Sequence, residues 1–211
     1  MTPSPMGAVA VIFLAAILTN NIILSKFLGM CSFIAISKNL RTAWGMGLAV
    51  TFVTTCTAGI NYAIYYGILV EGSPWLQMDL TYLSFLVFIM VIAGFVQLVE
   101  MVIERTSPVL HYNMGIFLPL ITVNCAILGV NLFMIEPVIM VEGGHFDFLQ
   151  TVIFALGSGL GYLLAICLMA GIRLRLEHAD IPEALKGLGI TMIITGLMAM
   201  AFMGFTGIVE L

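Results

Sequence analysis

The chain has 211 residues, of which 62% are hydrophobic and 9% are charged, and its formal net charge is -4. A soluble globular domain carries about 25% charged residues, so this composition predicts an integral membrane protein. The acidic balance provides no basic surface, which argues against a nucleic-acid partner. The short polar connections leave no room for an added soluble catalytic domain.

Six apolar segments are long enough to cross a bilayer, for which about 20 apolar residues suffice. They occupy residues 7–36, 42–70, 81–103, 113–135, 149–172 and 187–208. The first two are longer than one straight span requires, so we expect them to tilt, break or project beyond the membrane. The predicted fold class is an all-α integral membrane protein with six transmembrane helices in one membrane domain, residues 1–211.

Lysine and arginine are confined to alternate connections between these segments. Lys26, Lys38 and Arg41 lie at or near the end of the first segment, Arg105 follows the third, and Arg173, Arg175 and Lys186 lie between the fifth and the sixth. These seven are all the lysines and arginines of the chain. The remaining connections carry acidic residues, namely Glu71, Asp79, Glu136, Glu142 and Asp147. The positive-inside rule places the basic connections in the cytoplasm and both termini on the periplasmic side.

The first and fourth segments carry polar residues at membrane depth. Segment 115–125 contains Pro119, which removes a backbone donor, and ends with an asparagine followed by Cys125. Segment 19–31 begins with a threonine and two asparagines and ends with Cys31. Lipid cannot satisfy freed backbone groups, so breaks here must be sheltered by protein or line a cavity. We therefore predict that helices 1 and 4 are broken and form the functional centre.

The two halves of the chain resemble each other. The repeated patterns are TNN at 19–21 with TVN at 122–124, and AWGMGL at 43–48 with ALGSGL at 155–160. Each half holds three segments, an odd number, so the second copy must be inverted relative to the first. We expect inverted repeats of about 1–107 and 108–211, with the broken helices meeting near the midplane of the membrane.

Cys31 and Cys125 are the strongest candidates for chemistry, because each follows a predicted break. Helix ends that face each other leave unpaired N–H groups, which favour a negative ligand such as a thiolate-ligated iron–sulfur cluster. Buried structural thiols are the alternative reading. A cluster usually needs four thiolates, so a partner would supply two of them. Otherwise Cys56 and Cys167 would have to join, although both lie in the middle of a span.

Other polar residues have open assignments. Four asparagines either bond the freed backbone or line an ion path, namely Asn20, Asn21, Asn124 and Asn131. The long side chain of Lys26 allows its ammonium group to reach the cytoplasmic boundary. Glu100 is expected at the interface rather than within the membrane, because it lies within about one turn of Glu104 and Arg105. Three histidines lack a ligand spacing, namely His111, His145 and His178.

Several stretches resemble a known family, the E-type subunits of the Na⁺-translocating NADH:quinone oxidoreductases. FLGMCSF at 27–33 and FLPLITVNCAI at 117–127 look like the two signature segments of that family. The resemblance continues in LAI at 164–166 with AGIR at 170–173, and in GLGIT at 187–191 with GLM at 196–198. A sister family, the A-type subunits of the Rnf electron-transport complex, is also similar, particularly in MGLA at 46–49 and TSPVL at 106–110. Together these stretches extend over essentially the whole chain.

This resemblance implies six transmembrane helices in an inverted repeat, paired with a homologous D-type subunit of opposite orientation. Two cysteines from each of the two chains would hold an intramembrane 2Fe–2S cluster, and the matching positions here are Cys31 and Cys125. The cluster would relay electrons between a cytoplasmic NADH-oxidising subunit, which carries flavin and iron–sulfur groups, and a periplasmic flavin-bearing subunit. The complex would oxidise NADH, reduce ubiquinone and export sodium across the bacterial inner membrane. The chain alone would do no substrate chemistry and has no catalytic residue.

Two other functions fit the same pattern. A secondary ion transporter would also use inverted repeats with broken helices, and a purely structural membrane subunit needs no functional cysteine. The acidic connections around 71–79 and 136–147 are longer than usual for the family, which leaves the contacts on the outer face open.

Overall fold

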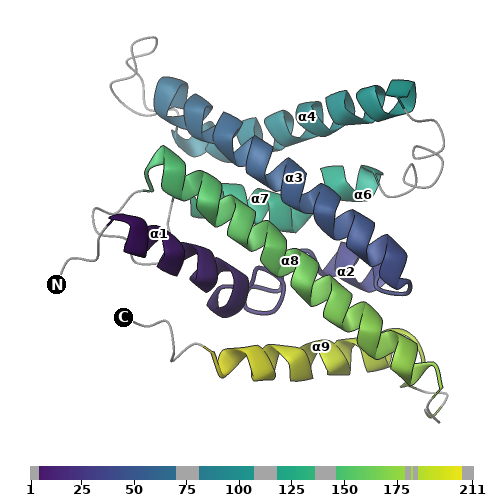
Figure 1. Ribbon diagram of the computed structural model, residues 1–211. Coiled ribbons are helices and arrows are strands. Elements are labelled where there is room, and N and C mark those ends of the chain that lie inside the picture. Colours follow the sequence, from purple (N-terminus) through teal and green to yellow (C-terminus); the bar gives the residue numbers. More distant parts are fainter. Residues whose placement is uncertain are drawn as a thin grey trace.

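The computed structural model describes residues 5–69, 81–106, 118–135, 146–178, 182 and 185–205. Within these residues the regular elements are helices (Figure 1). In the first half they are α1 (Pro5–Leu14), η1 (Ala15–Thr19), α2 (Met30–Ile36), α3 (Leu40–Ile64), η2 (Tyr65–Leu69), η3 (Thr81–Leu83) and α4 (Ser84–Thr106). In the second half they are α6 (Leu118–Thr122), α7 (Cys125–Phe133), α8 (Phe148–Leu176) and α9 (Leu188–Met203).

Three helices of the described chain are long and apolar enough to cross a membrane, at Leu40–Gly67, Ser84–Val102 and Phe148–Leu176. Shorter apolar helices lie within the other three expected segments, at Val9–Thr19, Pro119–Phe133 and Leu188–Met203. The interruptions predicted in the first and fourth segments are both present, since η1 ends ten residues before α2 begins, and α6 ends before α7 begins.

The two longest helices, α3 and α8, cross at the centre of the molecule (Figure 1). Small residues allow this close approach: a Cβ at Gly159 would stand 2.7 Å from the Thr51 Cα, and one at Gly47 would stand 3.0 Å from the Leu163 Cα. The pairing runs in opposite directions along the two helices, so they are antiparallel. Without a net hydrophobic drive between helices in lipid, such close backbone contact is a main source of association.

The remaining helices pack across the two halves of the chain. In the first half, α1 and η1 lie against α8, and in the second half α7 lies against α3. The outer helices also contact the other half of the chain: α4 contacts α6 and α7, and α9 contacts η1. Each interrupted segment is therefore supported mainly by the other half.

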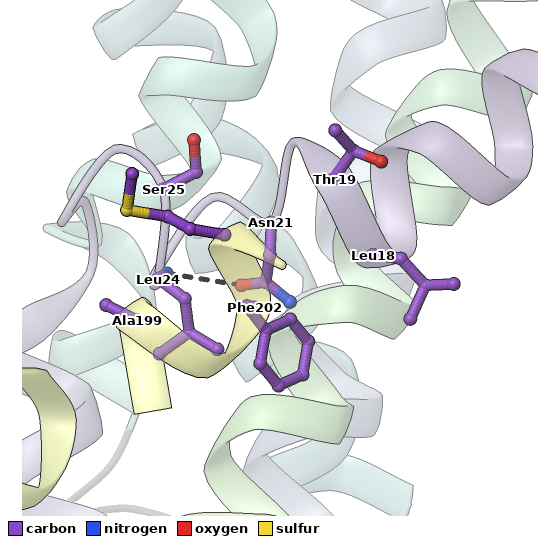
Figure 2. A pocket seen from close by; sticks show the side chains of 8 residues that line it. Leu18, Thr19, Asn21, Leu24, Ser25, Ala199 and Phe202 are labelled. Atoms are coloured by element: carbon purple, nitrogen blue, oxygen red, sulfur yellow. Dashed lines mark hydrogen bonds between the residues drawn. The ribbon is translucent and has the colours of Figure 1, made fainter. Parts of the chain in front are cut away.

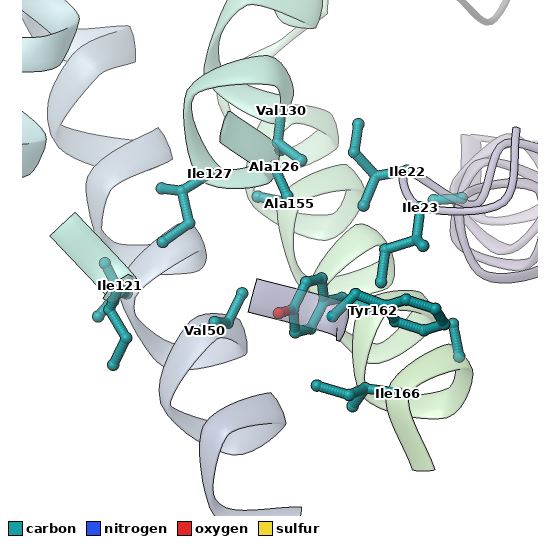
Figure 3. Close-up of a cluster of buried hydrophobic side chains, with 14 of the residues drawn as sticks. Ile22, Ile23, Val50, Ile121, Ala126, Ile127, Val130, Ala155, Tyr162 and Ile166 are labelled. Atoms are coloured by element: carbon teal, nitrogen blue, oxygen red, sulfur yellow. The ribbon is translucent and has the colours of Figure 1, made fainter. Parts of the chain in front are cut away.

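The buried side chains converge where these elements meet. Figure 3 shows Ile23 from the first interruption, Val50 from α3, Ile127 from α7, and Tyr162 and Ile166 from α8 around one cluster. All five side chains are buried. This cluster surrounds the two interruptions and excludes solvent from their inner side.

Large apolar side chains cover the outer surfaces of α4 and α9. On α4 they include Leu86, Met90 and Met101, and on α9 they include Leu197 and Met200. Such exposure is typical of helices that face lipid or another membrane protein rather than water.

Candidate cysteine site at the two helix interruptions

The first interruption is closed by one fully buried asparagine. The amide nitrogen of Asn21 donates to the carbonyl oxygens of Ile17 (3.1 Å) and Gly161 (2.8 Å). Its side-chain oxygen accepts the backbone N–H of Ile23 at 3.1 Å. Asn21 therefore satisfies backbone groups that the break leaves without helical partners, as a low-dielectric surrounding requires.

The second interruption is closed in the same way. Asn124 precedes α7, and its side-chain oxygen accepts the backbone N–H of Ala126 at 3.0 Å. In both breaks the asparagine therefore caps the N–H of the residue two positions later. Pro119 was expected to cause this break, but it lies within α6 and the helix continues to Thr122. The interruption thus coincides with the asparagine rather than with the proline.

A small cavity of about 40 Å³ lies beside the first interruption, between its chain and α9 (Figure 2). Asn21 is the most polar residue lining it, together with Thr19 and Ser25. The amide of Asn21 is already bonded to backbone groups, so the structure favours backbone capping over an ion path for Asn21 and Asn124. The cavity has room for water but is far too small for a cofactor.

The two interruptions meet at a contact between Gly29 and Cys125. The backbone N–H of Gly29 donates to the Cys125 Sγ at 2.9 Å. Cys31 lies two residues beyond Gly29, in the first turn of α2, and its side chain is exposed. Cys125 begins α7 and is half-buried. The structure thus brings together the two segments that carry the candidate cysteines.

Gly29 has a backbone conformation that other residues rarely adopt. Its φ is +87°, and a Cβ there would stand 3.0 Å from the Ala126 Cβ and 3.3 Å from Cε2 of Tyr162. Phe27, two residues earlier, also has a positive φ of 56°. The chain turns sharply through these residues, which directs the Gly29 N–H towards the Cys125 sulfur.

A hydrogen-bond network joins both interruptions to α8. The Ser32 hydroxyl donates to the Gly29 carbonyl at 2.9 Å and accepts the Asn124 amide at 3.2 Å. The Tyr162 hydroxyl lies 2.7 Å from the same Ser32 oxygen. Either hydroxyl could donate in this contact; when the single Ser32 proton goes to the Gly29 carbonyl, Tyr162 is the donor.

The candidate thiols do not form a complete metal site in this chain alone. Among the described residues there is no group of three or more His, Cys, Asp or Glu side chains placed to hold a metal ion. All four cysteines are free thiols, and Cys167 of α8 packs, half-buried, against the hydrophobic core. A metal centre at Cys31 and Cys125 would need ligands beyond those that the described part of this chain brings together.

The other polar candidates have separate environments. Asn131 is fully buried on α7, where it donates to the Ile127 carbonyl at 2.7 Å and accepts from the Asn61 amide at 2.8 Å. Asn20 is half-buried at the end of η1. Lys26 is exposed in the first interruption, with its Nζ 6.0 Å from the Phe133 ring centroid.

Charged and imidazole candidates lie at the edges of the described structure. Glu100 is half-buried near the C-terminal end of α4, and His178 is exposed just beyond the end of α8. His111, His145 and most of the two long acidic connections, 70–80 and 136–145, lie outside the described residues, as do both chain ends.

Sequence reasoning missed Ser32 and Tyr162, which link the two interruptions. The signal for Tyr162 was a phenol within an otherwise apolar span, since a buried tyrosine hydroxyl usually finds a partner. Arg173 was also missed as a structural residue. It was assigned only to the cytoplasmic charge pattern, although its guanidinium contacts α2 and α9.

The fold and this site define an α-helical membrane protein whose two interrupted helices meet at a pair of thiol-bearing segments. The model of the Rnf-Nqr subunit family, described as a membrane protein, matches residues 9–209. The chain therefore belongs to the Rnf-Nqr subunit family of membrane proteins.

Similar proteins share nearly the full length of the chain. The E-type subunit of the Na(+)-translocating NADH-quinone reductase of Nitrosomonas europaea is 46% identical over 207 residues, which cover 96% of this chain and 99% of the relative. The same subunit from Haemophilus influenzae strain PittEE is 47% identical over 197 residues, which cover 93% and 96%. Its counterpart from Aeromonas hydrophila is 46% identical over the same length. These matches confirm the resemblance to the E-type family.

Proposed function

We propose that this chain is the E-type membrane subunit of a Na⁺-translocating NADH:quinone oxidoreductase, and that it relays electrons through a 2Fe–2S cluster. Cys31 and Cys125 supply two of the four thiolate ligands, and a homologous D-type subunit supplies the other two. The proposal is carried by the contact from the Gly29 N–H to the Cys125 Sγ, which brings both cysteine-bearing interruptions to one place. The relatives described as E-type subunits support the identity of the complex.

The residues present suit half of such a ligand set. When bound, the cluster supplies one-electron transfer, and N–H groups aimed at its sulfurs tune its reduction potential. The Gly29 N–H is already directed at Cys125. Cys31 is exposed, and so are its apolar neighbours at the breaks, Phe27 (54%) and Val123 (78%). An open face of this kind allows a second chain to complete the ligands.

The proposed architecture is six transmembrane helices in two inverted repeats. The contacts between the two halves support this architecture, because the interrupted helix of each half packs against the long central helix of the other half. Asn21 and Asn124 support it further, since residues matched in sequence cap the same backbone position. The basic connections would face the cytoplasm and both termini the periplasm of the inner membrane.

In the assembled complex, the remaining partners would be a flavin and iron–sulfur subunit that oxidises NADH in the cytoplasm and a flavin-bearing subunit in the periplasm. The interrupted helices explain how an electron relay within the membrane would reach both of these subunits. They bring the cofactor position deep into the membrane while only short helical segments cover it on either side. In this proposal the chain itself binds and orients the cluster, and it carries out no substrate chemistry.

The test is iron analysis with low-temperature electron paramagnetic resonance (EPR) on the complex purified without oxygen. Cys31→Ser and Cys125→Ser should each abolish one cluster signal and remove about two iron atoms per complex, while subunit composition is retained. Cys167→Ser is the matched control, because that half-buried thiol packs against the hydrophobic core from within α8, and it should leave the signal unchanged. An unaltered cluster signal in both Cys31→Ser and Cys125→Ser would refute the proposal.

A further inference from the structure

Helix α2, which carries Cys31, is too short to be stable on its own. It has seven residues, whereas isolated helices below about 12 residues are marginal even with strong helix formers. Its position therefore depends on neighbouring groups. At its N-terminal end the Ser32 hydroxyl is bonded to Tyr162 of α8. At its C-terminal end the contacts come from Arg173, also of α8.

Arg173 connects three acceptors on two helices. Its Nη1 donates to the Ile34 carbonyl and to the Ser37 hydroxyl, each at 2.9 Å. Its Nη2 donates to the Thr191 hydroxyl of α9 at 2.5 Å. Thr191 gives its own proton to the Gly187 carbonyl, so it is free to accept from the arginine. This arrangement uses the planar fork of a guanidinium, which the point charge of a lysine does not reproduce.

The positive charge of Arg173 also suits its position at the C-terminal end of α2. Ile34 is in the last turn of α2 and Ser37 is its C-terminal cap residue. The carbonyl end of a helix carries partial negative charge, which favours a cation there. Arg173 thus stabilises the end of α2 both by direct hydrogen bonds and by its charge.

Tyr162 and Arg173 act from one face of one helix. They are eleven residues apart on α8, which corresponds to about three turns and roughly 16 Å. That length is sufficient to hold a seven-residue helix at both of its ends. Since α8 is the long central helix, it serves as a rigid support against which α2 is fixed at two points.

We propose that Arg173 is a positioning residue for Cys31, which it acts on through α2; this rests on the proposed role of Cys31 as a cluster ligand. The hydrogen bonds of Arg173 restrain α2 against rotation about its axis and against movement away from α8. Without Arg173, α2 keeps the attachment at Ser32 and Gly29 and the burial of its apolar side chains, but its C-terminal end loses these hydrogen bonds, and we expect the thiol at position 31 to change direction. The link to Thr191 further ties the position of Cys31 to the start of α9.

The test compares Arg173→Gln and Arg173→Lys with Arg175→Gln in the purified complex. Arg175 is exposed two residues further along α8, so its variant removes the same charge from the same helix end. Amide hydrogen exchange of peptide 30–37 should accelerate about tenfold in both Arg173 variants, and remain as in the wild type in Arg175→Gln. The midpoint potential and EPR g-values of the cluster should also shift in the Arg173 variants only.

Two results would overturn the proposal. Unchanged amide hydrogen exchange in peptide 30–37 of Arg173→Gln would show that the hydrogen bonds of Arg173 do not hold α2 in place. Faster exchange with wild-type potential and g-values would show that Arg173 stabilises α2 without positioning the thiol. A cluster signal that survives Cys31→Ser would instead refute the role of Cys31 itself. The amide hydrogen exchange of peptide 30–37 would still show whether Arg173 holds α2. Ser37→Ala, which removes one acceptor, should give a smaller acceleration if the larger changes prevent assembly.

Discussion

Replacing Gly29 with alanine tests the backbone conformation that brings the two cysteine segments together. A non-glycine residue at φ +87° costs about 1–2 kcal/mol. The new methyl group would also stand 3.0 Å from the Ala126 Cβ and 3.3 Å from the Asn124 side-chain oxygen, and such overpacking adds about 1–3 kcal/mol. Together these effects predict a loss of about 2–5 kcal/mol, and the chain relieves it by moving Gly29 away from Cys125.

The assay is thermal unfolding of the purified complex, measured together with its iron content and cluster EPR signal. Gly29→Ala should lower the unfolding midpoint and shift or abolish the cluster signal, because the hydrogen bond from the N–H of residue 29 to the Cys125 Sγ is lost. Gly94→Ala is the matched control, since nothing lies within 4 Å of a Cβ at that exposed position of α4, and it should be neutral or slightly stabilising. Wild-type stability and an unaltered EPR signal in Gly29→Ala would refute the reasoning.

Three further predictions concern the contacts around this site. Tyr162→Phe removes the hydroxyl that bonds to Ser32, so it should lower the free energy of unfolding by about 1–2 kcal/mol and shift the potential of the proposed cluster. Thermal unfolding and redox titration measure these changes, and unchanged values for both would contradict the network. Asn131→Leu leaves the Asn61 amide without its acceptor and should cost about 1 kcal/mol, whereas adding Asn61→Leu should recover part of that loss in a double-mutant cycle. Gly159→Val places carbon atoms within the backbone of α3 and should abolish assembly, as judged by copurification of the other subunits; a normal yield of complex would contradict the close helix contact.

The interrupted helices could be predicted from the sequence because their signal is local. Asparagine within an apolar run has few ways to be satisfied in a membrane, and capping a helix break is one of them. The same logic led to Cys31 and Cys125. It was wrong about the cause of the second break, because Pro119 lies within α6 and the break follows three residues later.

The contacts that join the site could not be predicted, because they depend on how distant helices cross. Ser32 and Tyr162 are 130 residues apart, and Arg173 lies 139 residues from Ile34. In the sequence Arg173 belongs to a basic connection, and its place in the charge pattern gives no hint that it contacts α2. Only the register of α8 against the first half brings these groups together.

The hydrogen bond between Gly29 and Cys125 spans 96 positions and crosses from one half of the chain to the other. During synthesis, the first cysteine therefore enters the bilayer long before its counterpart has left the ribosome. The contact between the two cysteine-bearing segments forms only after the later half has been inserted and has folded back onto the earlier one. Under the proposed function, delivery of iron and sulfide would therefore be a late event in biogenesis, and a chain truncated before the fourth apolar segment would lack Cys125, one of the two proposed ligands.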